Sequence, residues 1–112
     1  MNNIIKTPKT PYYAVIFTSI RTLGDKGYGK MGEEIEKEIS DQIGFLGAES
    51  MRNDQGFGVT ISYWKNLESI NKWKKNPLHI IAKEKGKKLW YYNYMLRLCK
   101  VEYDHYFDKK PQ

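Results

Sequence analysis

The sequence predicts an α+β domain, in which a four-stranded antiparallel sheet carries two helices on one of its faces. Four runs rich in aromatic and β-branched residues are typical of strands, and two stretches with apolar residues at helical spacing lie between them. The 112 residues suit one domain, and their 40% apolar and 14% aromatic content can fill one core. This composition excludes disorder for most of the chain.

The chain divides into an arm, a domain and a tail. Residues 1–11 are polar and contain two prolines, so we expect a flexible N-terminal arm. Residues 12–104 form the domain, and the charged residues 105–112 form a C-terminal tail. The domain opens with a predicted strand from Tyr12 to Thr22, which is apolar on both faces, and three glycines within residues 23–29 end it.

A helix and a hairpin follow the first strand. Apolar residues recur every four positions within residues 30–43, which predicts a helix there that Gly44 closes. Residues 45–52 and 57–64 are predicted strands, joined by a polar turn that ends in Gly56.

The second half of the domain predicts another helical segment and a last strand. Asn66 is the expected N-cap, and Asn76 with Pro77 renews the helical segment to about Lys88, because proline suits the first position of a helix. Residues 90–103 form the last strand. The order β-α-β-β-α-β favours the ferredoxin-like arrangement, with both helices on one face of the sheet.

The sheet is expected to need a second chain. Two helices cover only one side of four strands, and a solvated second side would show alternating polar residues. The last strand is instead largely apolar or aromatic on both sides, with Trp90, Tyr92, Tyr94, Leu96 and Leu98 on one and Tyr91, Asn93, Met95, Arg97, Cys99, Val101 and Tyr103 on the other. We therefore predict a homodimer with sheet packed on sheet; the alternative is that aromatic tips lie along a solvated sheet.

Composition narrows the class of protein further. The single cysteine, Cys99, excludes an intrachain disulfide and a cysteine-based zinc cluster. No apolar run approaches the roughly 18 residues of a membrane span, and residues 1–11 lack the apolar core of a secretory signal. We expect a cytoplasmic protein without a membrane partner, a metal site or a cofactor.

Charge is unevenly distributed along the chain, whose formal net charge is +6. Residues 65–88 contain eight lysines against two glutamates, whereas residues 30–41 contain five acidic residues against two lysines. This pattern is typical either of two solvated helix faces or of a surface that attracts anions.

Two motifs resemble the antibiotic biosynthesis monooxygenase (ABM) domain family. Residues 42–50, QIGFLGAES, are similar to the family's Q-P-G-F-L-G-x-E-S turn, with Ile43 in place of the proline. Residues 62–79 resemble the family's Y-W-x-(S/N)-x-E-x-I-x-x-W…H pattern. The matching residues are Tyr63, Trp64, Glu68, Ile70, Trp73 and His79. The likeness covers roughly residues 12–103.

The resemblance implies a dimeric α/β barrel with a pocket between sheet and helices in each subunit. Some family members oxygenate polycyclic phenols there without metal or flavin, and those that degrade haem carry an asparagine on the first strand and a later helical histidine. This chain offers Ser19 and His79 instead. The implied function is a cofactor-independent monooxygenase acting on a small planar aromatic or quinone-like molecule. The alternative is a non-catalytic protein that binds a small ligand or haem, with a stress or housekeeping role.

Cofactor-free oxygenation needs an electron-rich phenol or enol anion in a dry pocket, together with a base and hydrogen-bond donors. We predict that His79 is the base, and that Trp73 and Asn66 complete the catalytic set. Trp64 and Trp73 would form an aromatic wall for a planar ligand. The predicted substrate-binding residues are Trp64, Tyr63, Arg52 and Phe17.

These residues also have purely structural interpretations. The two tryptophans can fill the core or the dimer interface, and His79 can be a surface or packing histidine. Arg52 can pair with Glu49 or Asp54 on its own hairpin.

RNA binding is a competing class, because the same order of elements serves RNA recognition domains. Residues 56–58, Gly-Phe-Gly, resemble part of their aromatic box, but Gln55 replaces its basic residue, and Val59 and Ser62 replace its aromatic residues. We therefore predict no nucleic-acid partner.

Overall fold

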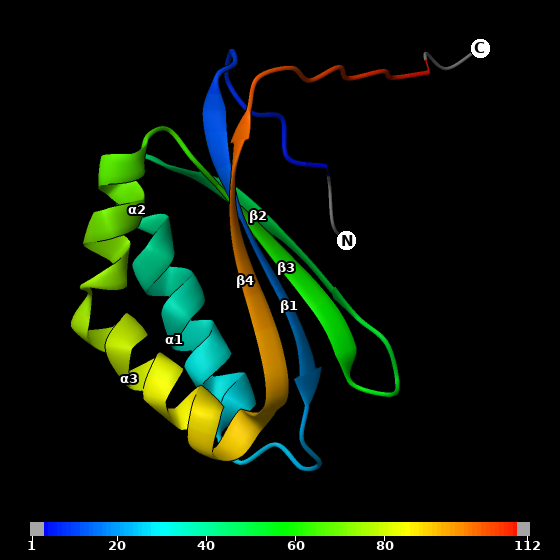
Figure 1. Ribbon diagram of the computed structural model, residues 1–112, viewed down its shortest axis with the longest axis vertical. Helices are drawn as coiled ribbons and strands as arrows, with labels where there is room; N and C mark the ends of the chain where they lie inside the picture. The colour runs from blue at the N-terminus through cyan, green and yellow to red at the C-terminus, as the bar shows by residue number, and fades with distance from the viewer. Residues whose placement is uncertain (1–3, 110–112) are drawn as a thin grey trace.

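The computed structural model describes residues 4–109 and confirms the predicted α+β, ferredoxin-like architecture. The four-stranded antiparallel sheet has the order β2-β3-β1-β4, and the helices lie on one of its faces (Figure 1). The strands are β1 (Tyr12–Arg21), β2 (Phe45–Arg52), β3 (Phe57–Trp64) and β4 (Tyr91–Val101). The helices are α1 (Tyr28–Ser40), α2 (Leu67–Lys74) and α3 (Pro77–Lys85), followed by one π-helical turn, η1 (Gly86–Trp90).

The second helical segment is divided into two helices, so the observed order is β-α-β-β-α-α-β. Asn76 has an extended backbone, with φ −63° and ψ 129°, and its side chain accepts hydrogen bonds from the backbone N–H groups of Leu78 and His79. Pro77 then begins α3, as its fixed φ allows. The helical path continues through η1 to Trp90, so β4 is shorter than predicted at both ends.

The α1 helix ends at Ser40, and Gly44 has a different role from the predicted helix closure. Gly44 has φ +87°, and a Cβ at this position would lie 2.0 Å from Oγ of Ser69 in α2. Its carbonyl oxygen accepts a hydrogen bond from the backbone N–H of Lys65 at 2.8 Å. The missing side chain therefore lets the loop before β2 approach α2 closely, while Ile43 points into solvent.

The core lies between the sheet and the helices. Its buried centre and the partly buried residues packed on it are Trp64, Ile70 and Trp73, with Tyr13, Val15, Ile35, Ile39 and Phe45. Because side chains alternate along a strand, the odd-numbered residues of β1 face the helices. The antiparallel register then places Leu96 and Leu98 of β4 on this same side, opposite Phe17 and Val15.

The opposite side of the sheet, which we call the free face, has no helix over it (Figure 1). Its apolar residues are Ile16, Ile20, Met51, Phe57, Val59, Ile61 and Met95. The arm lies along one end of this face, where the backbone N–H of Ile5 donates to Oε2 of Glu49 at 3.0 Å. Asp104, the residue before the tail, accepts a hydrogen bond from the Tyr12 hydroxyl at 2.6 Å. Within residues 4–109, neither the arm nor a helix covers the middle of the free face.

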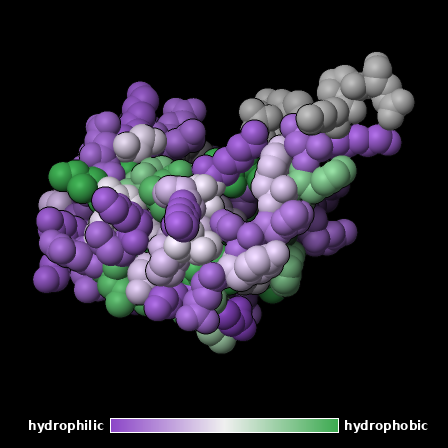
Figure 2. Space-filling view, turned by 90° about the horizontal axis from the view of Figure 1, so that it is seen from above, coloured by the Kyte–Doolittle hydropathy of each residue, from purple (hydrophilic) through white to green (hydrophobic). Residues whose placement is uncertain are grey.

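The charged side chains of the helices lie mainly at the surface. Seen from above, hydrophilic residues cover most of the molecule, with apolar residues between them (Figure 2). Within residues 4–109 the ion pair is the exposed Lys72–Glu68 contact at 3.5 Å, one turn apart in α2. The acidic α1 and the basic α2–α3 segment therefore present solvated faces.

We predict that Gly44→Ala lowers the free energy of unfolding by about 2 kcal/mol or more, since a β-carbon would meet Ser69 and the left-handed backbone is unfavourable for alanine. Gly32 provides the matched control, because nothing lies within 4 Å of a Cβ added there, in α1. Gly32→Ala should raise stability by roughly 0.5–1 kcal/mol. Urea denaturation followed by circular dichroism measures both, and equal stability of the two variants would contradict the close approach.

Candidate functional site

Two groups of aromatic side chains lie on the helix-facing side of the sheet. The first, which we call the tryptophan cluster, consists of Trp64, Trp73 and His79. The second, which we call the tyrosine cluster, consists of Phe17, Tyr28, Tyr91 and Tyr94. Tyr13 packs on the first cluster and Phe17 belongs to the second, so roughly 13 Å of β1 separates the two.

The tryptophan cluster brings together three of the residues predicted from the sequence. Trp64 is 1% exposed, and its ring centroid lies 6.4 Å from that of Trp73. Because α3 restarts at Pro77, His79 lies in its first turn and stacks on Trp73, with ring centroids 4.8 Å apart and an interplanar angle of 22°. The pair of tryptophans thus forms part of the core, and the imidazole covers one face of Trp73.

The hydrogen bonding of His79 defines the state of its imidazole. Nδ1 lies 3.1 Å from the carbonyl oxygen of Trp73. A carbonyl only accepts, so Nδ1 carries the proton in this bond, and in the neutral ring Nε2 keeps its lone pair. Burial lowers the pKa of His79 below its usual 6.5, nearby Lys83 lowers it further, and the carbonyl of Trp73 acts in the opposite direction. A neutral imidazole with a basic Nε2 suits a general base at neutral pH.

The tyrosine cluster was not predicted from the sequence. The ring centroid of Phe17 lies 5.1 Å from that of Tyr94 and 5.2 Å from that of Tyr91. Strict alternation would place Tyr91 and Tyr94 on opposite sides of β4, but the register shifts between Ile20 and Arg21, and both rings meet Phe17. The available signal was the density of aromatic residues after residue 90, and the irregular register that unites them is invisible in the sequence.

Burial raises the pKa of Tyr91 well above its ordinary value, and the neighbouring phenol of Tyr28 raises it further. The positive charges of Arg52 and Arg21 oppose this shift. The hydroxyl of Tyr91 therefore stays protonated at physiological pH.

Arg52 places a partly buried cation beside the tyrosine cluster. Its Nη2 donates to Ser19 Oγ at 2.8 Å, and Nη1 donates to the carbonyl oxygens of Ser19, at 3.2 Å, and Gly56. Gly58 stands opposite on β3, where a Cβ would lie 2.7 Å from Cζ of the guanidinium. Ser19 is two residues from Phe17 on the same side of β1. Ser19, Gly56 and Gly58 thus hold the guanidinium on the helix-facing side.

The remaining predicted residues have other contacts. Asn66 caps α2, with its side-chain oxygen accepting from the backbone N–H of Ser69 at 2.9 Å and from its hydroxyl at 2.7 Å. Tyr63 lies on the free face and donates to Glu49 Oε1 at 2.6 Å. Burial, with this hydrogen bond to Glu49, raises the pKa of Tyr63 to about 12. Glu49 is thus bound to Tyr63 and Ile5, and the guanidinium of Arg52 binds neither Glu49 nor Asp54, the pairing considered from the sequence.

Residues 4–109 contain neither a cluster of metal ligands nor a helix suited to cross a membrane. No group of three or more His, Cys, Asp or Glu side chains there is arranged to hold a metal ion. None of the helices in that range is long and apolar enough to cross a bilayer.

Solved structures with this arrangement of strands and helices define the class of fold. SnoaB, a cofactor-independent oxygenase from Streptomyces nogalater, superimposes with a TM-score of 0.71 over 85% of this chain and 97% of its own, at 10% identity. Rv0793 from Mycobacterium tuberculosis gives a TM-score of 0.70 over 86% and 98%, at 11% identity. PA3566 from Pseudomonas aeruginosa gives 0.65 over 92% and 100%, at 10% identity. The expected likeness to ABM-type proteins is therefore confirmed in the fold.

One relative is close enough in sequence to define the family. The uncharacterized protein YqjZ of Bacillus subtilis is 44% identical over 109 residues, which cover 97% of this chain and 96% of YqjZ. This chain belongs to the same family as YqjZ. No protein-family model matches the sequence.

The pH dependence of stability tests the environment of His79. Because its pKa is lowered in the folded state, its contribution to stability is present above pH 6.5 and is lost as the pH falls through the folded-state pKa. We expect the free energy of unfolding to fall between pH 7.5 and 5.5 in the wild-type protein and to fall less in His79→Gln. His105→Gln, in the exposed tail, is the control that should retain the wild-type slope. Identical slopes for all three proteins would contradict this assignment.

Proposed function

We propose that this protein binds a small planar aromatic molecule on the helix-facing side of the sheet and oxygenates it without a cofactor. The observation that carries the proposal is the partly buried guanidinium of Arg52, held by Ser19 beside the aromatic rings of Phe17, Tyr91 and Tyr94. Aromatic rings favour a planar ligand, and the cation favours its anionic form. The shared fold with SnoaB, a cofactor-independent oxygenase, supports the same activity.

In the proposed reaction, Arg52 and the protonated hydroxyl of Tyr91 stabilise the phenolate or enolate that reacts with dioxygen. A polycyclic substrate lying along β1 would extend toward Nε2 of His79, which takes a proton from the ring CH₂ group at that end, so that the negative charge is delocalised through the conjugated rings to the oxygen beside Arg52. This CH₂ group then becomes a carbonyl. One oxygen atom forms the carbonyl, and the other leaves as water with the two hydrogens of that carbon. The substrate supplies all four electrons that reduce dioxygen, so no other reductant is required.

Oxygen uptake with a panel of hydroquinones and polycyclic phenols tests this function. We expect Arg52→Gln to lower kcat/KM by about 100-fold or more, because one preorganised donor to a developing anion is lost. Arg52→Lys should restore part of the activity, since it retains the charge but loses the planar fork. Lys37→Gln is the control for loss of a positive charge, because Lys37 is exposed on α1, away from the aromatic clusters and from the free face.

Circular dichroism of each variant separates loss of chemistry from loss of folding. Ligand binding without oxygen uptake across the panel would contradict the oxygenase and favour a non-catalytic ligand-binding protein. A Soret shift on adding haem, with no uptake of oxygen, would favour the haem-binding alternative.

We further propose that two copies pair through their free faces. The exposed side chains there include Met51, Phe57 and Met95, and the middle of this face has no covering layer within residues 4–109. A second copy offers the same apolar surface, so a two-fold contact is self-complementary. If about 500 Å² of apolar surface is covered, the gross gain is roughly 12 kcal/mol before the entropy of association.

Two adjacent residues of β4 provide a matched test of this interface. Met95 on the free face is 53% exposed, and Leu96 on the helix-facing side is 52% exposed. By light scattering, we expect the wild-type protein to have twice the 13.2 kDa chain mass. Met95→Lys should shift it to the monomer mass, because it buries an unpaired charge in the interface, while Leu96→Lys should remain dimeric. A wild-type monomer at micromolar concentration would rule out the pairing.

A further inference from the structure

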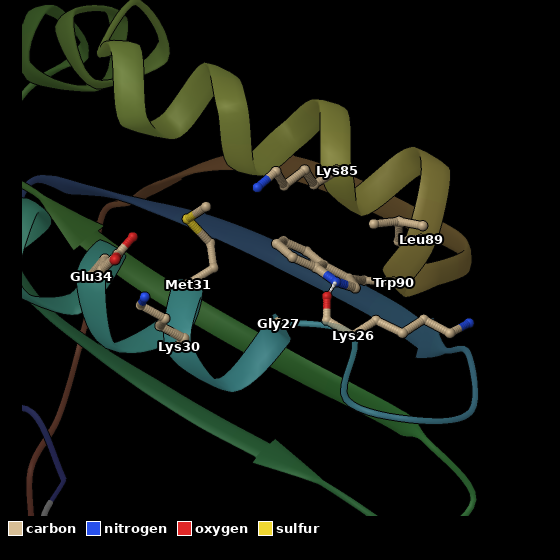
Figure 3. Close-up of a pocket in the computed structure, with 8 residues that line it drawn as sticks. All are labelled: Lys26, Gly27, Lys30, Met31, Glu34, Lys85, Leu89 and Trp90. Atoms are coloured by element: carbon tan, nitrogen blue, oxygen red, sulfur yellow. Dashed lines mark hydrogen bonds between the residues drawn. The ribbon is translucent and has the colours of Figure 1, made fainter.

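A cavity of about 230 Å³ lies between α1 and the α3–η1 segment, outside the two aromatic clusters. Its lining residues are Lys26, Gly27, Lys30, Met31, Glu34, Lys85, Leu89 and Trp90. Figure 3 shows the ring of Trp90 projecting into the space between the two helices, with Met31 reaching toward it from α1. The cavity is smaller than the ~300–1,000 Å³ typical of drug-sized ligands, so it has room for about one ring and a short substituent.

The apolar floor of the cavity is held rigidly. Trp90 is 3% exposed, and its indole Nε1 donates to the carbonyl oxygen of Lys26 at 2.9 Å. On its other side the indole meets Tyr28 edge-on, with centroids 5.7 Å apart. Lys26 has a left-handed backbone, with φ +51°, and its side chain points away from the cavity, so it contributes its carbonyl (Figure 3). At this burial the indole presents only an edge to the cavity, and Leu89, which is 43% exposed, offers a ring the larger apolar surface.

The walls bring cations from two different helices to this floor. Lys30 extends from α1, and Lys85 extends from α3 on the other side of Trp90 (Figure 3). Within residues 4–109, neither ammonium group has a carboxylate within salt-bridge distance, and Glu34, which also lines the cavity, is likewise without an ion-pair partner. Because the side chain of Lys26 points outward, the charged groups at the cavity are Lys30, Lys85 and Glu34. Together they give the lining a net positive charge.

We propose that this cavity binds a small monocyclic aromatic acid. The ring would pack on Leu89 and the exposed edge of Trp90, and the carboxylate would lie between Lys30 and Lys85. An anion satisfies both cations, whereas a cationic ligand would satisfy only Glu34 and meet two like charges. The basic character of the chain, with a net charge of +6, favours the same sign of ligand. This site is built from residues other than Arg52 and the predicted catalytic set, so it does not rest on the proposed oxygenase function.

Binding is tested with benzoate, benzyl alcohol and benzylamine, three single-ring probes that differ in charge. The reporter is the indole N–H resonance of Trp90 in two-dimensional NMR, because this proton is bonded to the rim of the cavity. We expect benzoate to shift this resonance and that of the Gly27 amide, to bind more tightly than the other two, and to weaken as salt is added. Equal affinity for the three probes, or no shift at Trp90 with benzoate up to about 10 mM, would overturn the proposal.

Charge variants of the lining give the assignment a signed test. Lys30→Gln and Lys85→Gln should each weaken benzoate binding about two- to five-fold, the range typical of one exposed charge contact. Glu34→Gln should strengthen it, because the repelling carboxylate is removed. Lys37→Gln is the matched control on α1, since Lys37 does not line this cavity, and should leave affinity unchanged. If Glu34→Gln weakens binding, or Lys37→Gln has the same effect as Lys30→Gln, the carboxylate does not lie between the two lysines.

Discussion

The packing of Trp64 against α2 is the contact on which the rest of the structure depends. This indole ends β3, is 1% exposed, and packs with Ile70 and Trp73 in the buried centre of the core. A buried indole N–H requires an acceptor, and Ser62, two residues earlier on the same side of β3, provides it at 2.9 Å. With α2 held against the sheet in this way, the loop before β2 can approach α2 only because residue 44 is glycine. The chain that follows α2 changes direction at Asn76, where α3 begins.

The predicted site contains two kinds of residue, those that fill the core beside α2 and those that keep a polar group free to react. Trp64 and Trp73 are buried in the core, whereas His79, stacked on one face of Trp73, keeps one ring nitrogen free of the Trp73 carbonyl. At the other end of β1, the guanidinium of Arg52 occupies the space that Gly58 leaves empty. The proposed cation, Arg52, and the proposed base, His79, thus lie near opposite ends of β1, an arrangement that suits an elongated ligand better than a compact one.

Proteins with this fold can differ in function, so the function of this chain depends on its side chains and not on the arrangement of its strands and helices. SnoaB, PA3566 and Rv0793 superimpose over more than four-fifths of the chain but are only 10 to 11% identical to it, so they show a shared arrangement of sheet and helices and nothing more. YqjZ, at 44% identity, is similar enough for the contacts described here to be compared residue by residue.

The sequence by itself determined the four strands, the helix cap at Asn66, the restart at Pro77 and the apolar character of both sheet sides, because these features depend on local periodicity and on the backbone preferences of single residues. Only the tertiary structure decided which side chains meet. The guanidinium of Arg52 binds Ser19, which is 33 positions away in sequence, and not the carboxylates of its own hairpin. The side chain of Tyr63 lies on the free face, where it binds Glu49. Such contacts follow from strand register and from one irregularity in the pairing of β1 with β4, and a shift of one residue there reverses the face of every side chain beyond it.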